Sequence, residues 1–289
     1  MMRTTSAPPI DVTALVPALA QWVRSTVRLH PRRGTPGASQ SHVGGPLLWG
    51  PNEDWPTCDE HSRDIGEPGA GRFVVVGQFF SRDLPEFFFP SGFDMVQILW
   101  CPNDHYVEYP WGGEYEGPDV RIFWRDSKSI TDFVPMIPEL PPLLNDAYRV
   151  HPCTISPEMV AEYPFVEELP DELMRIVDEI DRARDFQYQY ALSVAKGWKV
   201  GGWANWNVTG IERNYCPNCR SDLRLLLKVD SSEWDGASDR WWPLEDRALT
   251  PDGMSRAYEP TGVDVGRFGE LRVFICQQNA MHRPVLNIQ

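Results

Sequence analysis

Tyr215-Cys216-Pro217-Asn218-Cys219 is the stretch around which the chain is organised. Two cysteines separated by two residues, one of them Pro, form a tight turn in which both sulfurs face one ion. Zinc in proteins takes four tetrahedral ligands, usually Cys and His. A second Cys and a His follow far downstream, at the end of an apolar run. The second half therefore predicts a Cys3His zinc site with these ligands: Cys216, Cys219, Cys276 and His282.

The first half of the chain repeats this layout. Val43-Gly44-Gly45 precedes Trp49 as Val200-Gly201-Gly202 precedes Trp206, and a pair of ligand residues, an apolar run and a second Cys follow each time in the same order. Several matches in one order indicate an internal repeat. The repeat predicts a second zinc ion, with these ligands: Cys58, His61, Cys101 and His105.

Two alternative roles for the cysteines stay open. Buried free cysteines behave as small apolar side chains, and this alternative weighs more in the first half, where the spacing is looser. Disulfides are disfavoured in a reducing compartment, and they leave the paired histidines unexplained.

Length and charge bound the classes of function. The chain has 289 residues, enough for two domains or one duplicated domain, and 27 Lys and Arg against 41 Asp and Glu give a net charge of −14. This charge disfavours nucleic acid and anionic membrane as partners and favours a basic protein or peptide segment. No apolar run approaches the roughly 20 residues of a membrane span. Residues 1–10 lack the apolar core of a secretory signal, so we expect a cytoplasmic protein.

The pattern of the chain predicts a mainly β, α+β fold made of two duplicated antiparallel sheet halves with a few helices. Short apolar runs rich in β-branched and aromatic residues indicate buried strands. We expect five of them: Phe73–Phe80, Met95–Trp100, Val120–Trp124, Leu223–Val229 and Leu271–Ile275. Polar stretches at 114–119 and 235–267 are expected to be loops.

Four segments follow from this pattern. Residues 1–41 form a lead with a helix from Asp11 to Leu29, and 42–135 form the first repeat. Residues 136–195 form a Pro-rich connector, with a helix start at Ser156-Pro157 and a firmer amphipathic helix from about Pro170 to Asp185. Residues 196–289 form the second repeat.

The order of these motifs resembles a known family. Val-Gly-Gly-x3-Trp, a ligand pair, an apolar strand and a strand ending in Cys resemble the bacterial YwqG-like proteins over residues 42–289. They are also similar to the eukaryotic programmed-cell-death-2 family, which carries a Val-Gly-Gly-x-Pro-x-Trp element followed by Cys-x2-Cys and an apolar strand. In the second repeat, Trp203 stands at the position that matches Pro46 of the first repeat. The resemblance implies a duplicated β-rich fold, a chaperone of a ribosomal protein in the eukaryotic relatives, and toxin immunity for some bacterial ones. His61 departs from the pattern, where Cys is expected.

A non-enzymatic, zinc-stabilised protein-binding module is the function we expect, acting as a chaperone or adaptor for a basic protein. Trp49, Trp203 and Trp206 are the candidate partner-binding residues, in a groove between the halves rimmed by Asp and Glu. An immunity protein that binds a toxin is one alternative. A zinc hydrolase or deaminase is another, but a deaminase needs Pro before its first knuckle Cys and a His-x-Glu or Cys-x-Glu element, and the chain has neither. A nucleic-acid-binding zinc ribbon is disfavoured by charge.

Overall fold

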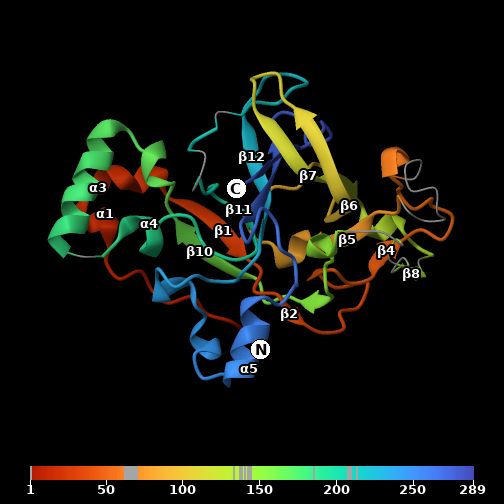
Figure 1. Ribbon diagram of the computed structural model, residues 1–289, viewed down its shortest axis with the longest axis horizontal. Coiled ribbons are helices and arrows are strands. Elements are labelled where there is room, and N and C mark those ends of the chain that lie inside the picture. The colour runs from red at the N-terminus through yellow and green to blue at the C-terminus, as the bar shows by residue number, and fades with distance from the viewer. Residues whose placement is uncertain are drawn as a thin grey trace.

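Two antiparallel six-stranded sheets form the body of the protein (Figure 1). The computed structural model describes residues 2–61, 71–132, 134–136, 139, 141, 145–184, 186–206, 210–212 and 214–289. Sheet 1 has the order β2 (Arg32–Arg33), β9 (Cys153–Thr154), β3 (His42–Val43), β5 (Val74–Phe80), β6 (Met95–Glu108) and β7 (Glu114–Arg125). Sheet 2 has the order β10 (Glu158–Glu162), β1 (Arg24–Arg28), β11 (Lys199–Gly201), β12 (Leu223–Asp230), β13 (Glu270–Cys276) and β14 (Val285–Ile288). The predicted mainly β class is confirmed.

Smaller elements flank the two sheets. β4 (Leu47–Trp49) and β8 (Val134–Met136) pair with each other outside sheet 1. The α-helices with described bounds are α1 (Val12–Leu15), α3 (Asp171–Arg184), α4 (Tyr188–Ala191) and α5 (Pro251–Tyr258). Figure 1 places α1, α3 and α4 at one end of the molecule and the β4–β8 pair at the other. Among the described residues, no helix has the length and apolarity needed to cross a membrane.

The duplication is visible in the register of the strands. Val43 lies opposite Gly77 in sheet 1, as Val200 lies opposite Leu227 in sheet 2. The pairing of β5 with β6 shifts between Val75 and Gly77, and the pairing of β12 with β13 shifts at the corresponding place, between Leu225 and Leu227. Such a shift is a β-bulge, in which one strand has an extra residue, and related sheets keep their bulges at the same place. The halves are therefore repeats of one unit.

Glycines at the end of β3 and β11 support the same conclusion. Gly44 and Gly201 both have positive φ, 64° and 73°, a conformation that costs glycine nothing. A Cβ atom on Gly44 would lie 2.7 Å from the carbonyl oxygen of His151. Backbone therefore approaches backbone closely at Gly44.

Each repeat places its first strand in the sheet of the other. β1 lies in sheet 2, with Val27 opposite Val200, and β9 lies in sheet 1, with Cys153 opposite Val43. β1 and β9 both lie outside the segments 42–135 and 196–289 that the sequence predicts as repeats. The exchange ties the halves together because each sheet needs a strand from the other repeat.

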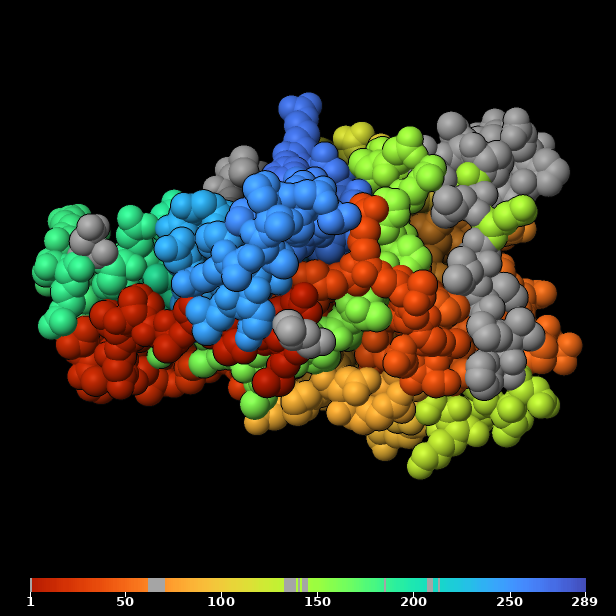
Figure 2. Space-filling view, turned by 90° about the horizontal axis from the view of Figure 1, so that it is seen from below, coloured from red at the N-terminus to blue at the C-terminus, as the bar shows by residue number. Residues whose placement is uncertain are grey.

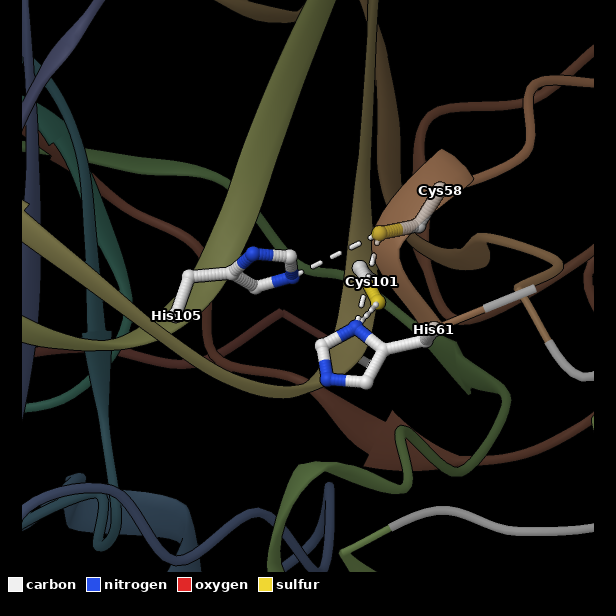
Figure 3. Close-up of side chains that lie close together, drawn as sticks. All are labelled: Cys58, His61, Cys101 and His105. Atoms are coloured by element: carbon white, nitrogen blue, oxygen red, sulfur yellow. Dashed lines mark hydrogen bonds between the residues drawn. The ribbon is translucent and has the colours of Figure 1, made fainter. Parts of the chain in front are cut away.

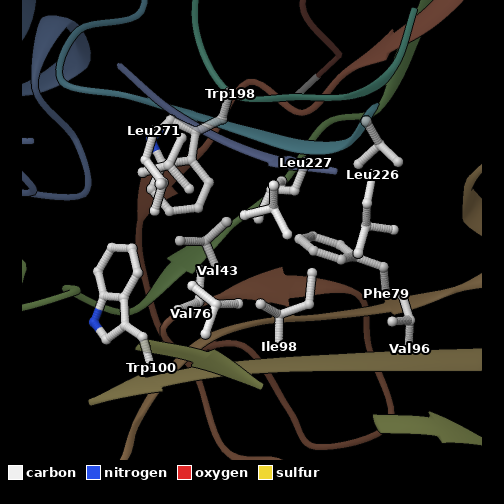
Figure 4. Close-up of a cluster of buried hydrophobic side chains, with 14 of the residues drawn as sticks. Val43, Val76, Phe79, Val96, Ile98, Trp100, Trp198, Leu226, Leu227 and Leu271 are labelled. Atoms are coloured by element: carbon white, nitrogen blue, oxygen red, sulfur yellow. The ribbon is translucent and has the colours of Figure 1, made fainter. Parts of the chain in front are cut away.

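One shared core lies between the sheets (Figure 4). Val43, Val76 and Ile98 from sheet 1 meet Trp198 and Leu227 from the second repeat, and all are at most 1% exposed. Burying an aliphatic or aromatic side chain of this size contributes roughly 1.5–3 kcal/mol each. The apolar runs predicted as strands supply most of these residues.

Sheet 2 carries charged residues where sheet 1 carries neutral polar ones. His42 and Gln78 face each other across β3 and β5, and Lys199 and Lys228 occupy the corresponding positions in β11 and β12. Lys199 Nζ lies 2.6 Å from a carboxylate oxygen of Glu162, and both side chains are fully buried. Buried charges of this kind are paired because an unpaired one is far more costly.

The N-terminal lead differs from the expected helix between Asp11 and Leu29. Asp11 does cap a helix, accepting from the Ala14 amide at 3.0 Å, but α1 lasts only four residues. A 3-10 turn follows over Pro17–Trp22, and Arg24–Arg28 is strand β1. Thr26 and Val27 are β-branched, and β1 gains pairing on both edges, from β10 and β11. Tertiary pairing here outweighs the helical pattern.

Three further expectations meet a similar correction. The helix start expected at Ser156-Pro157 is instead followed by strand β10, which pairs along its length with β1. Polar residues 114–119 belong to strand β7, and the stretch 235–267 contains helix α5, capped by the Thr250 hydroxyl. The amphipathic helix is confirmed as Asp171–Arg184, while Asp185 lies outside the described residues.

Residues 3–6 are held against the rest of the protein by hydrogen bonds. The Thr4 amide donates to Glu245 at 2.8 Å, and the Thr5 amide donates to Glu158 at 2.8 Å. Figure 2 shows red atoms of the N-terminal part beside the blue atoms of the chain around α5.

Candidate metal centres

The knuckle of the second repeat is held by backbone contacts with the start of β12. Tyr215 forms an isolated antiparallel bridge with Asp222, and the Cys216 amide donates to the Ser221 carbonyl at 2.9 Å. Residues 217–219 form the turn between them. Cys276 is the last residue of β13 and lies opposite Leu223, the first residue of β12. Strand pairing therefore brings a distant cysteine to the knuckle.

Four ligand atoms meet at this point. Cys216 Sγ lies 3.3 Å from His282 Nδ1, and Cys219 Sγ lies 3.5 Å from Cys276 Sγ. All four atoms lie within 4.8 Å of one another. A tetrahedral ion with bonds of about 2.3 Å to sulfur and about 2.0 Å to nitrogen separates its ligands by about 3.3–3.8 Å. The geometry fits one tetrahedral metal ion. We call this group the Cys3His site.

Hydrogen bonds prepare one sulfur of the Cys3His site to be a thiolate. Burial opposes the charge on Cys276, but the Ser221 hydroxyl, the Asn279 amide and Cys219 together lower the pKa of Cys276 to about 6. The Ser221 oxygen lies 3.0 Å from the Cys276 sulfur, and the Asn279 amide donates to it at 3.4 Å. The thiolate is the form that ligates metals.

The first repeat builds its cluster with the same backbone contacts. Thr57 bridges Arg72 as Tyr215 bridges Asp222, and the Cys58 amide donates to the Gly71 carbonyl at 2.6 Å. The pairing of β5 with β6 then places Cys101 one residue beyond Trp100, which lies opposite Val74. The duplication therefore extends to the way in which the ligands are positioned.

Two sulfurs and two imidazoles converge in the first repeat (Figure 3). His61 Nδ1 lies 3.4 Å from the sulfurs of both Cys58 and Cys101, and His105 Nε2 lies 3.9 Å from the Cys58 sulfur. The two imidazole rings meet edge to face at 4.7 Å. These separations also suit one tetrahedral ion. We call this group the Cys2His2 site.

A carboxylate orients one ligand of the Cys2His2 site. Glu60 has an oxygen 3.3 Å from His105 Nδ1, so Nδ1–H donates to it and the Nε2 lone pair faces Cys58. Such a carboxylate–histidine contact fixes the tautomer of metal-ligating histidines. Burial, and then the neighbouring Cys58, raise the pKa of Cys101 to about 12. A bound cation would stabilise both sulfurs as thiolates.

All eight predicted ligands are thus brought together in two groups of four. Cys153 is the one cysteine of the six that lies outside both groups, and its thiol donates to the His151 carbonyl at 3.3 Å. Neither cysteine alternative accounts for four ligand atoms that converge twice. Within the described part of the chain, these two groups are the ones that could hold a metal ion.

The three predicted partner-binding tryptophans have different surroundings. Trp49 is 1% exposed and packs on Trp55, with ring centres 4.9 Å apart. Trp206 is 5% exposed and stacks on Phe274, with ring centres 6.2 Å apart. Both rings are almost fully buried by interior packing. Trp203 is half-buried, and its ring remains partly accessible.

Sequence reasoning missed a set of polar residues beside Trp203. Glu168 receives a hydrogen bond from Trp206 Nε1 at 3.3 Å, and Arg24 lies over the Trp203 ring at 3.3 Å from its centre. No sequence motif joins these residues, because they come from three distant segments.

The chain was also compared with known proteins. No family model matches it, and no match is found among curated proteins. Its function is therefore inferred from the site itself.

Proposed function

We propose that both sites hold structural zinc. The donor sets support zinc, because thiolate and imidazole in tetrahedral sets of four are the ligands that structural zinc takes. Each ion would join the knuckle to the strand that pairs with β5 or β12, through Cys101 within β6 or Cys276 at the end of β13, and so clamp one sheet. Chelation of such sites usually removes folding free energy outright. Metal analysis of the purified protein tests this directly.

We further propose that the protein is a non-enzymatic module that binds a basic protein or peptide segment. The observation that carries this is the closed ligand set of both sites, because catalytic zinc keeps a position open for water or substrate. The net charge of −14 supports a basic partner, as does the resemblance to the chaperones of a ribosomal protein. In this proposal the zinc ions stabilise the fold, and the protein surface binds the partner.

Capture of partners from the native lysate tests the binding function. Basic proteins should be retained at low salt and released near 0.5 M salt, where the Debye length is only about 4 Å. Retention of neutral or acidic proteins alone would contradict the proposal. Identification of a toxin among the basic proteins would favour the immunity alternative over a chaperone.

A further inference from the structure

A groove of about 780 Å³ runs over the outer face of sheet 2. The residues before and at the start of α3, Glu167–Asp171, form one side, and Gly202–Trp206 form the other. Leu225 and Phe274 from β12 and β13 form the floor. A smaller pocket of about 360 Å³ adjoins it, since both are lined by Arg24, Gly202 and Arg224. Together they make an elongated depression rather than a closed cavity.

Aromatic rings line this groove. Trp22 and Trp203 stack on each other with ring centres 6.2 Å apart, and Trp206 stacks on Phe274 at the floor. Arg24 already lies over Trp203, with its guanidinium carbon 3.3 Å from the ring centre. The electron-rich face of an indole attracts cations. The site is therefore built of surfaces that accept a cationic side chain.

Two buried polar atoms that border the groove are available for further hydrogen bonds. One carboxylate oxygen of Glu168 accepts from Trp206 Nε1, and the Phe165 backbone also interacts with this carboxylate and favours its charge. The second oxygen is buried and makes no hydrogen bond of good geometry. The indole N–H of Trp22 is likewise buried and unpaired. Leaving such atoms unpaired is costly, so native structures rarely do it without a reason. A ligand with an N–H donor would satisfy Glu168.

Charge around the groove selects the ligand. The groove is lined by two arginines, Arg24 and Arg224, and by more carboxylates: Glu167, Glu168, Asp171, Glu212 and Asp222. Burial raises the pKa of Glu168 to about 7, even though Trp206 and Arg24 both favour its charged form. An additional cation would stabilise that carboxylate as an ion.

The pairing of β4 with β8 in the first repeat suggests that an extended segment fits beside residues 204–206. These residues correspond to β4, since Arg272 Nη1 donates to the Asn205 carbonyl as Gln97 Nε2 donates to the Leu48 carbonyl. In the first repeat, β4 pairs with the extended strand β8. No strand in the described part of the chain pairs with 204–206. In the second repeat, Ala204 and Trp206 line the groove instead.

We propose that this groove binds an extended, basic segment of a partner protein, which lies along residues 204–206 and places a Lys or Arg side chain against Glu168 and Trp203. The inference rests on the proposed protein-binding function and specifies its site. Main-chain pairing along the segment would give affinity, and the carboxylate with its aromatic neighbours would give specificity for a basic side chain.

A pair of synthetic peptides tests the site in the full-length, zinc-loaded protein. One is an acetylated heptapeptide that alternates Lys with Val and Thr, and the other carries Glu in place of every Lys. The Lys peptide should bind and change the tryptophan fluorescence, and the Glu peptide should not. Glu168→Gln should weaken binding of the Lys peptide at least tenfold, while Glu179→Gln, on an exposed position of α3 outside the groove, should not change it. Equal binding of both peptides, or full binding by Glu168→Gln, would overturn the proposal.

Two controls separate the groove from folding and from the general function. Glu168→Gln keeps the shape of the side chain and replaces its carboxylate with a neutral amide, so its melting temperature should match or exceed that of the wild type. Trp203→Ala is a second, independent variant, and it should also weaken binding of the Lys peptide. If a basic protein is captured from lysate equally by the wild type and by both variants, the groove is refuted and the binding function stands. If the Lys peptide binds as expected but no basic protein is captured, the binding function fails and the groove's chemistry stands.

Discussion

Cys101 and Cys276 occupy the same position in the two sheets. Each ends the apolar part of the strand that pairs with β5 or β12, and each pairing carries the same shift in register a few residues away. Each sulfur then meets a knuckle held by the same backbone bridge. The two candidate metal sites are thus part of the repeated unit, and changing one of them should leave the other's ligands in place.

Removing Cys219 should destabilise the whole protein. Cys219→Ala leaves the Cys3His site with three ligands and frees the end of β13 from the knuckle, so we expect insoluble or protease-sensitive protein. Limited proteolysis measures this. Cys153→Ala is the matched control, because Cys153 is buried but lies outside both clusters. This variant should lose only about 1 kcal/mol of unfolding free energy, and the protein should keep its metal. A well-folded Cys219→Ala protein that melts like the control would contradict the account.

The Cys2His2 site should bind its own ion. Cys101→Ser should reduce the zinc content by one ion per chain, while the Cys3His site keeps the other. His61→Cys makes the ligand set the same as that of the second repeat, since His61 and Cys219 hold corresponding places, and it should keep both ions. Elemental analysis of the purified variants measures the content. A wild-type content of one ion, unchanged in Cys101→Ser, would show that the first cluster holds no metal.

Acid should destabilise the protein partly through His42. The Gly45 amide donates to His42 Nδ1 at 3.1 Å, and Nε2–H donates to the Pro46 carbonyl at 2.9 Å, so the ring is neutral. Burial lowers the pKa of His42 to about 4, below its ordinary 6.5. Between these values the unfolded chain binds the extra proton, so the free energy of unfolding falls as the pH drops, by about 2 kcal/mol from pH 7 to pH 5.

His42→Gln tests that contribution. The variant lacks the titrating ring, so its loss of stability from pH 7 to pH 5 should be about 2 kcal/mol smaller than that of the wild type. Urea unfolding at both pH values measures the difference, and acid release of metal affects both proteins alike. Equal losses in the two proteins would mean that His42 does not titrate in this way.

Strand exchange should make the halves depend on each other. Fragments 2–141 and 142–289 each lack a strand of their own sheet, β9 for sheet 1 and β1 for sheet 2. We expect each fragment alone to be unfolded, with its core side chains exposed, and the two together to form soluble, folded protein. Circular dichroism of the separate and mixed fragments checks this. Independent folding of either fragment would contradict the interlocked fold.

The elements that could be predicted were those with a local signal. β5, β12 and β13 follow from their largely apolar runs, and the ligands follow from the knuckle and its repeat. β1 and β10 could not be predicted, because they are held by pairing with each other and with β11, and no local pattern encodes a partner so distant in the chain. The tryptophan content of the chain favours partner binding by Trp49 and Trp206, but these rings are covered by Phe123 from β7 and Phe274 from β13.

X-ray absorption at the zinc edge, combined with elemental analysis of the protein as purified from its own cells, tests the central claim most directly. The account predicts two zinc ions per chain, with five sulfur and three nitrogen ligands shared between them, as the two clusters provide. It also predicts no oxygen ligand, because both sites are closed by protein. A single ion, or a bound water oxygen in the coordination sphere, would contradict it.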